Sequence, residues 1–96
     1  MITHIVIWKY RPEVTQAMRD EHVARLKTIS SVVPGIERFS VGFDILHSPR
    51  SYDTGLVAVF SDRAALDAYT IHPDHVKVAE LGRSVSDLVA SVDFES

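Results

Sequence analysis

Hydrophobic residues recur along this chain with two different periods, and these periods divide it into strands and helices. Residues 2–10, 36–44, 52–60 and 86–95 are rich in β-branched and aromatic residues that alternate with other side chains, which is typical of strands. Residues 13–32 instead repeat at spacings of three and four, which predicts a helix with one buried face. The positions on that face are Val14, Met18, His22, Leu26, Ile29 and Val33.

Proline, glycine and small polar residues mark the element boundaries. Pro12 or Thr15 can begin the first helix, and Pro34-Gly35 ends it. Residues 45–51 form a loop between two strands, and Pro49 within it prevents strand pairing.

A second helix begins after Ser61 or Asp62, either of which can cap it, and it is interrupted at His72-Pro73. Proline lacks a backbone N–H, so it is unfavourable inside a helix but favourable at the first helical position. We therefore expect a further helical segment to begin at Pro73 and to close at Gly82.

The resulting order of elements is β-α-β-β-α-β, which is the order of the ferredoxin-like fold. This order predicts an α+β domain with a four-stranded antiparallel sheet and helices on one face. Residues 1–96 form one domain, because no linker, repeat or low-complexity segment divides them.

The predicted sheet is apolar on both faces. Alternation groups Ile5, Ile7, Val57, Val59 and Val89 on one face and Val6, Trp8, Leu56, Ala58, Leu88 and Val92 on the other. Helices cover only one face of such a sheet. Leaving the other set in water forfeits on the order of 10 kcal/mol, comparable with the stability of a small domain. We therefore predict a homodimer whose two sheets pack face to face.

Composition narrows the classes of partner. The net charge is −3, and Lys and Arg are scattered, so no nucleic-acid surface is predicted. No apolar run approaches the ~20 residues that cross a bilayer, and the N-terminus lacks signal-peptide features. We therefore expect no membrane partner and a cytoplasmic location. The absence of cysteine excludes disulfides and a thiol nucleophile.

The segment from Tyr69 to His75 concentrates side chains that can do chemistry. Histidine acts as a general base near neutral pH, and a tyrosine hydroxyl can hold or polarise an oxygen. The spacing of these two residues would separate them on an unbroken helix, but a break at His72-Pro73 can bring both to one pocket. We take His75 and Tyr69 as candidate catalytic residues. Residues expected to line their pocket are His4, Val6, Trp8, His22 and His72.

Each histidine also has a structural interpretation. His72 can cap the helical segment that follows it, while His4 and His22 can be hydrogen-bonded core residues. His72 and His75 are three residues apart, which differs from the spacing in zinc peptidase helices, and no third ligand lies nearby. We predict no metal site and no cofactor, since phosphate-binding and dinucleotide-binding glycine motifs are also absent.

Several segments together resemble the stress-responsive α/β-barrel (Dabb) family, and the resemblance extends over nearly the whole chain. They are Ile2-Thr3-His4-Ile5-Val6, Val41-Gly42, Tyr52-Asp53, Phe60-Ser61-Asp62-Arg63-Ala64-Ala65-Leu66, Ala68-Tyr69, His72-Pro73-Asp74-His75 and Val92-Asp93-Phe94. The resemblance implies a dimeric α+β barrel, in agreement with the two apolar sheet faces.

The family includes cofactor-free polyketide cyclases and muconolactone isomerases. In the cyclases, the residues that match His75 and Tyr69 are the catalytic base and its partner, and the one that matches His4 lines the pocket. Trp8 and His22 are departures, because a long acyl tail requires a larger and more apolar cavity. We favour a stress-related protein that binds a small apolar molecule. The alternatives are a cyclase or isomerase that uses His75 and Tyr69, and a purely structural oligomer.

Overall fold

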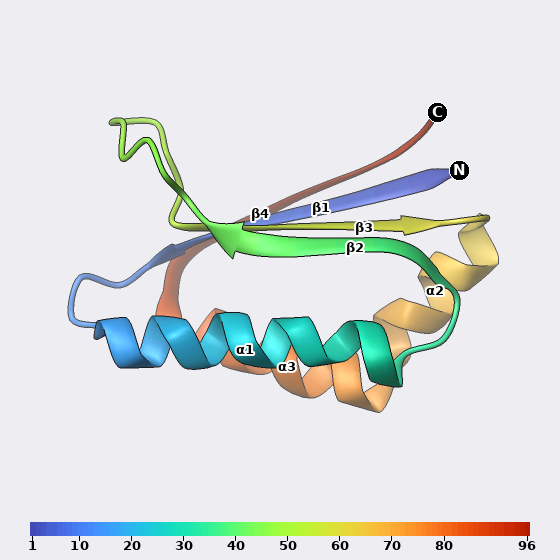
Figure 1. Cartoon of the computed structure of the whole chain (residues 1–96), viewed down its shortest axis with the longest axis horizontal. Helices are drawn as coiled ribbons and strands as arrows, with labels where there is room; N and C mark the ends of the chain where they lie inside the picture. The colour runs from blue at the N-terminus through green and yellow to red at the C-terminus, as the bar shows by residue number, and fades with distance from the viewer.

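The computed structural model describes residues 1–96 and has the predicted ferredoxin-like architecture, with helices on one side of a four-stranded sheet (Figure 1). The elements in chain order are β1 (Ile2–Tyr10), α1 (Gln16–Val32), β2 (Ile36–Phe43), β3 (Thr54–Phe60), α2 (Arg63–Ile71), α3 (Pro73–Val85) and β4 (Ser86–Glu95). The strand order is β2-β3-β1-β4, and all three pairings are antiparallel. None of the helices is both long and apolar enough to cross a membrane.

Side-chain caps settle where the helices begin. The Thr15 hydroxyl accepts a hydrogen bond from the backbone N–H of Met18, so α1 begins after Thr15 rather than at Pro12. The Asp62 carboxylate accepts from the N–H of Ala65 at 2.9 Å, so Asp62, not Ser61, caps α2. In both cases a short acceptor side chain satisfies an N–H that the first turn leaves free.

The break between α2 and α3 is a shared cap at His72. Its backbone N–H bonds the Tyr69 carbonyl at the end of α2, and its ring Nδ1 accepts from the Asp74 N–H at 3.2 Å. Pro73 occupies the first position of α3, where its missing N–H costs nothing. The chain therefore changes direction at this point without losing either helix.

The prediction that Gly82 ends the last helix is wrong, because α3 continues to Val85. Gly82 is buried inside the helix against two rings: a Cβ on it would lie 2.7 Å from Nε1 of Trp8 and 3.0 Å from Nε2 of His22. A residue with a side chain cannot occupy this position unless those rings shift. Close packing, not helix termination, explains the glycine here.

The core lies between the helices and the covered face of the sheet. Its buried members include Trp8, Leu26, Ile29, Leu56, Ala58, Phe60, Leu66, Tyr69 and Val78. The face predicted for α1 is buried at Val14, His22, Leu26 and Ile29, but Met18 is 43 % exposed. Val23 is buried in its place, so the buried stripe of α1 runs slightly differently from the predicted one.

The register of β4 corrects the predicted sheet faces. Val92 pairs directly with Ile5, and Val89 pairs with Trp8. Because directly paired residues point to the same side of a sheet, Val92 and Leu88 lie on the uncovered face, and Val89 lies on the helix face. Alternation within a strand cannot reveal this, since a shift by one residue reverses every assignment.

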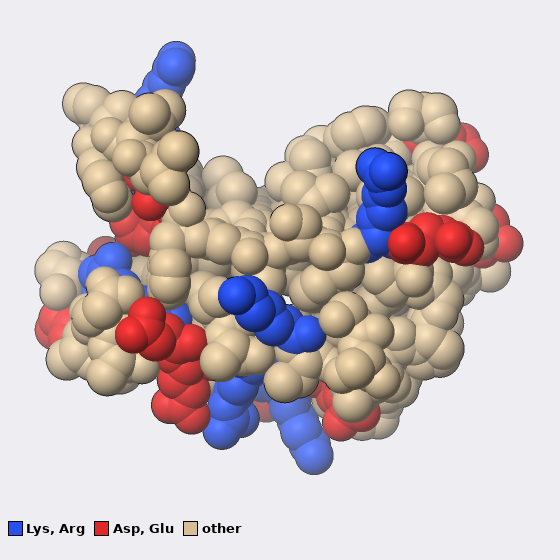
Figure 2. All heavy atoms as spheres, in the orientation of Figure 1, with Lys and Arg blue, Asp and Glu red and all other residues tan.

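The face of the sheet opposite the helices, which we call the open face, is apolar. Its hydrophobic residues are Ile5, Ile7, Val57, Val59, Leu88, Ala90, Val92 and Phe94. Four of them are substantially exposed: Val57 at 38 %, Leu88 at 53 %, Val92 at 52 % and Phe94 at 45 %. The β2–β3 loop rises on this side (Figure 1), and the space-filling view shows an uncharged hollow beside it (Figure 2).

Candidate functional site

A cavity of about 190 Å³ lies between the covered face of the sheet and the helices. Its lining comes from every element except β2, and comprises His4, Val6, Trp8, Leu26, Ile29, Leu56, Tyr69, His75, Ala79, Arg83, Val89 and Ser91. A wider groove of about 710 Å³ shares His4 and Ser91 with it but runs past exposed Arg63, Asp67 and Glu95. The smaller cavity is the candidate site, because it is mostly apolar with a few convergent polar groups.

The helix break brings Tyr69 and His75 together in this cavity. Tyr69 lies in the last turn of α2 and His75 in the first turn of α3, and their ring centroids are 4.2 Å apart. The planes are inclined by 37°, so the two rings are partly stacked. A continuous helix would hold these positions on different faces, and the change of direction at His72-Pro73 therefore creates the pair.

The backbone determines which nitrogen of His75 carries its proton. Nδ1 lies 3.1 Å from the Thr70 carbonyl oxygen, which can only accept, so Nδ1 is the donor. Burial is the largest effect and lowers the pKa of His75. The hydrogen bond to Thr70 opposes it, and the charges of His4, Arg83 and His72 lower the pKa further. The ring is consequently neutral near pH 7, with Nε2 free to accept a proton.

Tyr69 supplies a hydroxyl without a protein partner. Only 1 % of the residue is exposed, and its hydroxyl makes no hydrogen bond within the chain. Burial, with a contribution from the charge of Asp93, raises the pKa of Tyr69 to about 12. The phenol is therefore protonated at neutral pH and can donate to a ligand oxygen. An unpaired donor that faces a cavity is available to bind a ligand oxygen.

His4 is a further polar residue of the cavity, and its ring is held by Asp93, a partner that the sequence did not predict. Its ring lies edge-on to Tyr69, with centroids 5.6 Å apart, and its Nδ1 pairs with the Asp93 carboxylate. Asp93 is directly opposite His4 in the β1–β4 pairing. Asp93 thus orients the His4 imidazole, in the way that carboxylates commonly fix a functional histidine.

The two other histidines predicted to line the pocket do not do so. His72 is committed to capping α3, where its Nδ1 accepts from Asp74. His22 lies on the buried face of α1, behind Trp8, with the two ring centroids 5.0 Å apart. Trp8 itself lines the cavity, and His22 contacts the Trp8 ring without belonging to the lining.

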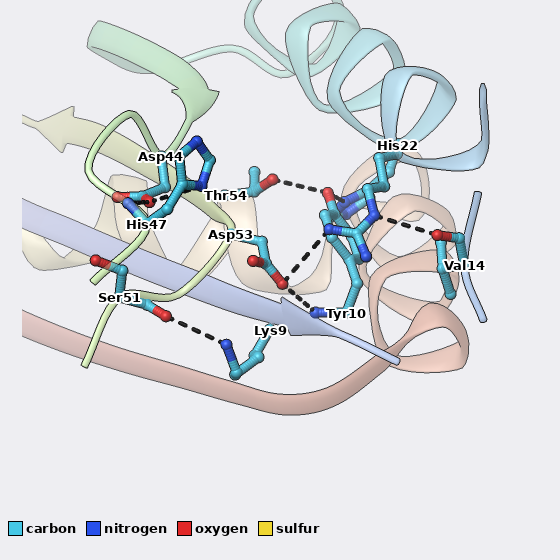
Figure 3. Close-up of polar contacts among 10 residues, drawn as sticks. Lys9, Tyr10, Val14, His22, Asp44, His47, Ser51, Asp53 and Thr54 are labelled. Carbon is cyan, nitrogen blue, oxygen red and sulfur yellow. Dashed lines mark hydrogen bonds and ion pairs between the residues drawn. The ribbon is translucent and has the colours of Figure 1, made fainter. Parts of the chain in front are cut away.

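His22 belongs instead to a second polar cluster at the other end of the sheet (Figure 3). The Tyr10 hydroxyl lies 2.7 Å from His22 Nδ1 and 2.8 Å from the Thr54 hydroxyl. Burial lowers the pKa of His22 to about 4, so the ring is neutral. Asp53 accepts from the Tyr10 backbone N–H at 2.9 Å. These contacts fasten β1 to α1 and β3, which gives His22 a structural role.

Two further lining residues, Ala79 and Arg83, follow His75 at successive spacings of four. This spacing places both residues on the same face of α3 as His75, so their position in the lining could have been predicted from the sequence. No group of three or more His, Cys, Asp or Glu side chains comes together as a set of metal ligands. The imidazoles and hydroxyls that line the cavity can transfer protons and form hydrogen bonds.

The profile of the Stress responsive A/B Barrel Domain, Dabb, matches residues 2–96. The chain belongs to the Dabb family. This membership confirms the resemblance seen in the sequence and agrees with the ferredoxin-like fold.

The similarity to known proteins covers almost the entire Dabb chain. Olivetolic acid cyclase of Cannabis sativa is 21% identical over 95 residues, covering 97% of this chain and 94% of the cyclase. A dimeric ferredoxin-like protein of unknown function from Thermobifida fusca superposes with a TM-score of 0.90 at 22% identity, covering 99% of this chain and 90% of that one. Hydroxynitrile lyase from Passiflora edulis superposes with a TM-score of 0.85 at 16% identity, covering 97% and 90%. At these identities the structural likeness establishes the fold.

Proposed function

We propose that this Dabb protein is an enzyme that transfers a proton next to the carbonyl group of a small molecule, using His75 as base and Tyr69 as hydrogen-bond donor. The observation that supports it is that one cavity contains both an unprotonated His75 Nε2 and a Tyr69 hydroxyl that has no hydrogen-bond partner. A base and a donor in contact are the two groups that enolate formation requires.

The proposed step balances without another reactant. His75 Nε2 takes a proton from the carbon next to the carbonyl, and the electron pair of that C–H bond moves into the carbonyl to form an enolate. The Tyr69 hydroxyl donates to the enolate oxygen and stabilises its charge. The enolate then attacks a second carbonyl of the same substrate, and the alkoxide that forms takes the proton from His75. Alternatively, an enolate conjugated with a C=C bond takes the proton back from His75 at another carbon. The first outcome is cyclisation, and the second is isomerisation.

Two relatives support an enzyme over a protein that only binds its ligand. One is named a cyclase and the other a lyase, and both cover nearly the whole chain. Both are distant, so their substrates do not transfer. The stress-related role that the family description names is compatible with either a catalyst or a binding protein.

Hydrogen–deuterium exchange tests the proposal without knowledge of the natural product. Small β-dicarbonyl compounds in D₂O exchange the protons between their carbonyls, and the wild-type protein should accelerate this exchange, as followed by NMR. General base catalysis is worth about 10²–10⁴-fold, so His75→Ala should lose most of the acceleration. Tyr69→Phe should lose part of it, because the base remains while the donor to the oxygen is removed.

His47→Gln is the matched control, since His47 is on an exposed loop and its ring is remote from the cavity lining. It should retain wild-type exchange. Equal acceleration by wild type and His75→Ala would contradict the proposal, and so would the absence of acceleration for every compound tested. In the second case, a protein that binds a small apolar molecule without turnover becomes the better interpretation.

We also propose that the protein is a homodimer joined through its open faces. Burying the exposed aliphatic side chains there stabilises association, at about 25 cal/mol per Å² of apolar surface. A contiguous apolar face on a small domain is typical of an interface, and the similar Thermobifida fusca protein is described as dimeric. The exposed side chains of Ile45 and Leu46, on the loop that rises beside this face, are further candidates for the interface.

Sedimentation velocity of a charged variant tests the dimer. Val92→Glu introduces a carboxylate in the open face, where Val92 is 52 % exposed and paired with Ile5, and it should dissociate the dimer. Ile71→Glu is the matched control, because Ile71 is 78 % exposed at the end of α2, away from this face. A wild-type protein with the mass of one chain at micromolar concentration would refute the dimer.

A further inference from the structure

Arg83 is the only permanently charged side chain among the residues that line the candidate cavity. It lies in the last turn of α3 and forms no ion pair, whereas Arg11, Arg19, Arg25 and Arg63 each pair with a carboxylate. A guanidinium carries five N–H donors in a planar fork, and it is always protonated. Arg83 is exposed to solvent where it borders the cavity, and it presents there a positive charge that no carboxylate of the chain pairs with.

No acidic residue in the lining competes for this charge. The other polar lining residues are His4, Tyr69, His75 and Ser91. The Tyr69 and Ser91 hydroxyls can donate hydrogen bonds to a ligand, whereas neutral His75 presents Nε2 as an acceptor. The carboxylate nearest to this set, Asp93, already pairs with His4. The cavity thus combines apolar walls with donors and one cation, which is complementary to an anionic group on an otherwise apolar molecule.

Arg83 also acts on the candidate base, because its charge is one of the causes that lower the pKa of His75. A ligand anion that pairs with Arg83 would offset that effect and make His75 more basic once the ligand is bound. Charge pairing and proton abstraction would then support each other.

The cavity limits how large this molecule can be. Its volume of about 190 Å³ is below the roughly 300–1,000 Å³ of pockets that hold drug-sized ligands. At about 30 Å³ for each water, it corresponds to on the order of six water molecules. A single small ring or a short branched chain fits within such a space, whereas a long acyl chain would have to extend out of it, toward the wider groove that also contains His4 and Ser91.

We propose that Arg83 binds a carboxylate, and that the ligand of this cavity is a small, largely apolar carboxylic acid. This inference rests on the proposed function in that it names the substrate class of the same cavity. Arginine matches the geometry of a carboxylate with two parallel hydrogen bonds, and such charge-assisted pairs are stronger than neutral ones. Arg83 is thus a specificity residue, while His75 and Tyr69 carry the proton transfer.

Calorimetric titration with pairs of probes of equal shape tests the inference. Phenylacetate and phenylacetamide form one pair, and isobutyrate and isobutyramide form another; both are measured at pH 8. The wild-type protein should bind each acid about ten- to a hundredfold more tightly than its amide. Arg83→Gln should abolish the preference for the acid, and Arg83→Lys should retain part of it, because charge remains without the planar fork.

Lys77→Gln is the matched control, since it removes the same charge from an exposed site of α3 that is absent from the lining. It should keep the preference for the acid. His4→Gln tests the other cationic candidate: loss of the preference in His4→Gln but not in Arg83→Gln would overturn the assignment. Acids that bind no more tightly than their amides, or that do not bind at all, would also overturn it.

These outcomes are separate from those of the exchange experiment. His75→Ala should still prefer acids, because binding does not require proton abstraction. If the protein prefers acids but does not catalyse exchange, the carboxylate site is supported and the proposed reaction is refuted. If the protein catalyses exchange but does not prefer acids to amides, the proposed reaction is supported and the carboxylate site is refuted.

Discussion

Replacing Gly82 with alanine has two physical effects on stability, and they have opposite signs. In a helix interior, alanine is more favourable than glycine by about 1 kcal/mol, so propensity alone predicts a more stable protein. The structure predicts the reverse, because the new Cβ would lie 2.7 Å from Nε1 of Trp8 and 3.0 Å from Nε2 of His22. Carbon atoms normally contact their neighbours at about 3.5–4.0 Å.

Neither ring can move away easily. Trp8 is 5 % exposed and His22 is fully buried, and His22 is held by its contact of 2.7 Å with the Tyr10 hydroxyl. Overpacking a closed core typically costs about 1–3 kcal/mol, and the rigidity of this cluster favours the upper part of that range. After the propensity gain is subtracted, Gly82→Ala should destabilise the protein by about 1–2 kcal/mol.

Thermal and urea unfolding at one fixed protein concentration measure this difference. In a domain of this size, about 1–2 kcal/mol lowers Tm by about 4–16 °C. Gly42→Ala is the control, because a Cβ on Gly42 meets nothing within 4 Å, and it should change stability by at most about 0.5 kcal/mol.

A double mutant shows whether the contact with Trp8 is the cause. Trp8→Phe removes Nε1, so adding Gly82→Ala to that variant should cost about 1 kcal/mol less than adding it to the wild type. A Gly82→Ala protein as stable as the wild type, or more stable, would refute the reasoning that the two rings exclude a side chain here.

Three other measurements follow from the structure. In the folded protein the pKa of His22 is about 4, whereas in the unfolded chain a histidine has its ordinary pKa of 6.5. Between these two pH values the unfolded state therefore binds more protons than the folded state. Stability should fall by up to about 3 kcal/mol as pH drops through this window, and His22→Leu, unlike His47→Gln, should flatten the slope seen in urea unfolding. Asp62→Ala should lower stability by about 1 kcal/mol through loss of the α2 cap, whereas Ser61→Ala should not change it. Catalysed exchange should persist below the ordinary histidine pKa, because burial lowers the pKa of His75; a pH–rate profile with its acid limb above that value would contradict this role.

The site could be predicted from the sequence only where local order decides the geometry. The proximity of Tyr69 and His75 followed from one proline in a helical pattern, because the break determines how two short helices meet. Asp93 could not be found in this way, since it lies 89 residues from His4 in the chain and meets it only through the register of β1 and β4. The location of His22 behind Trp8 likewise depends on how α1 lies against the sheet.

The sequence by itself determined the order of elements, the ferredoxin-like fold and the presence of a second apolar sheet face. These properties depend on periodicity, capping and turn residues, which act between neighbours along the chain. Only the tertiary structure decided which side of β4 faces the helices, why Gly82 must be glycine, and that Arg83 joins the cavity unpaired. Those properties depend on register and on contacts between distant segments, for which a single chain pattern allows more than one solution.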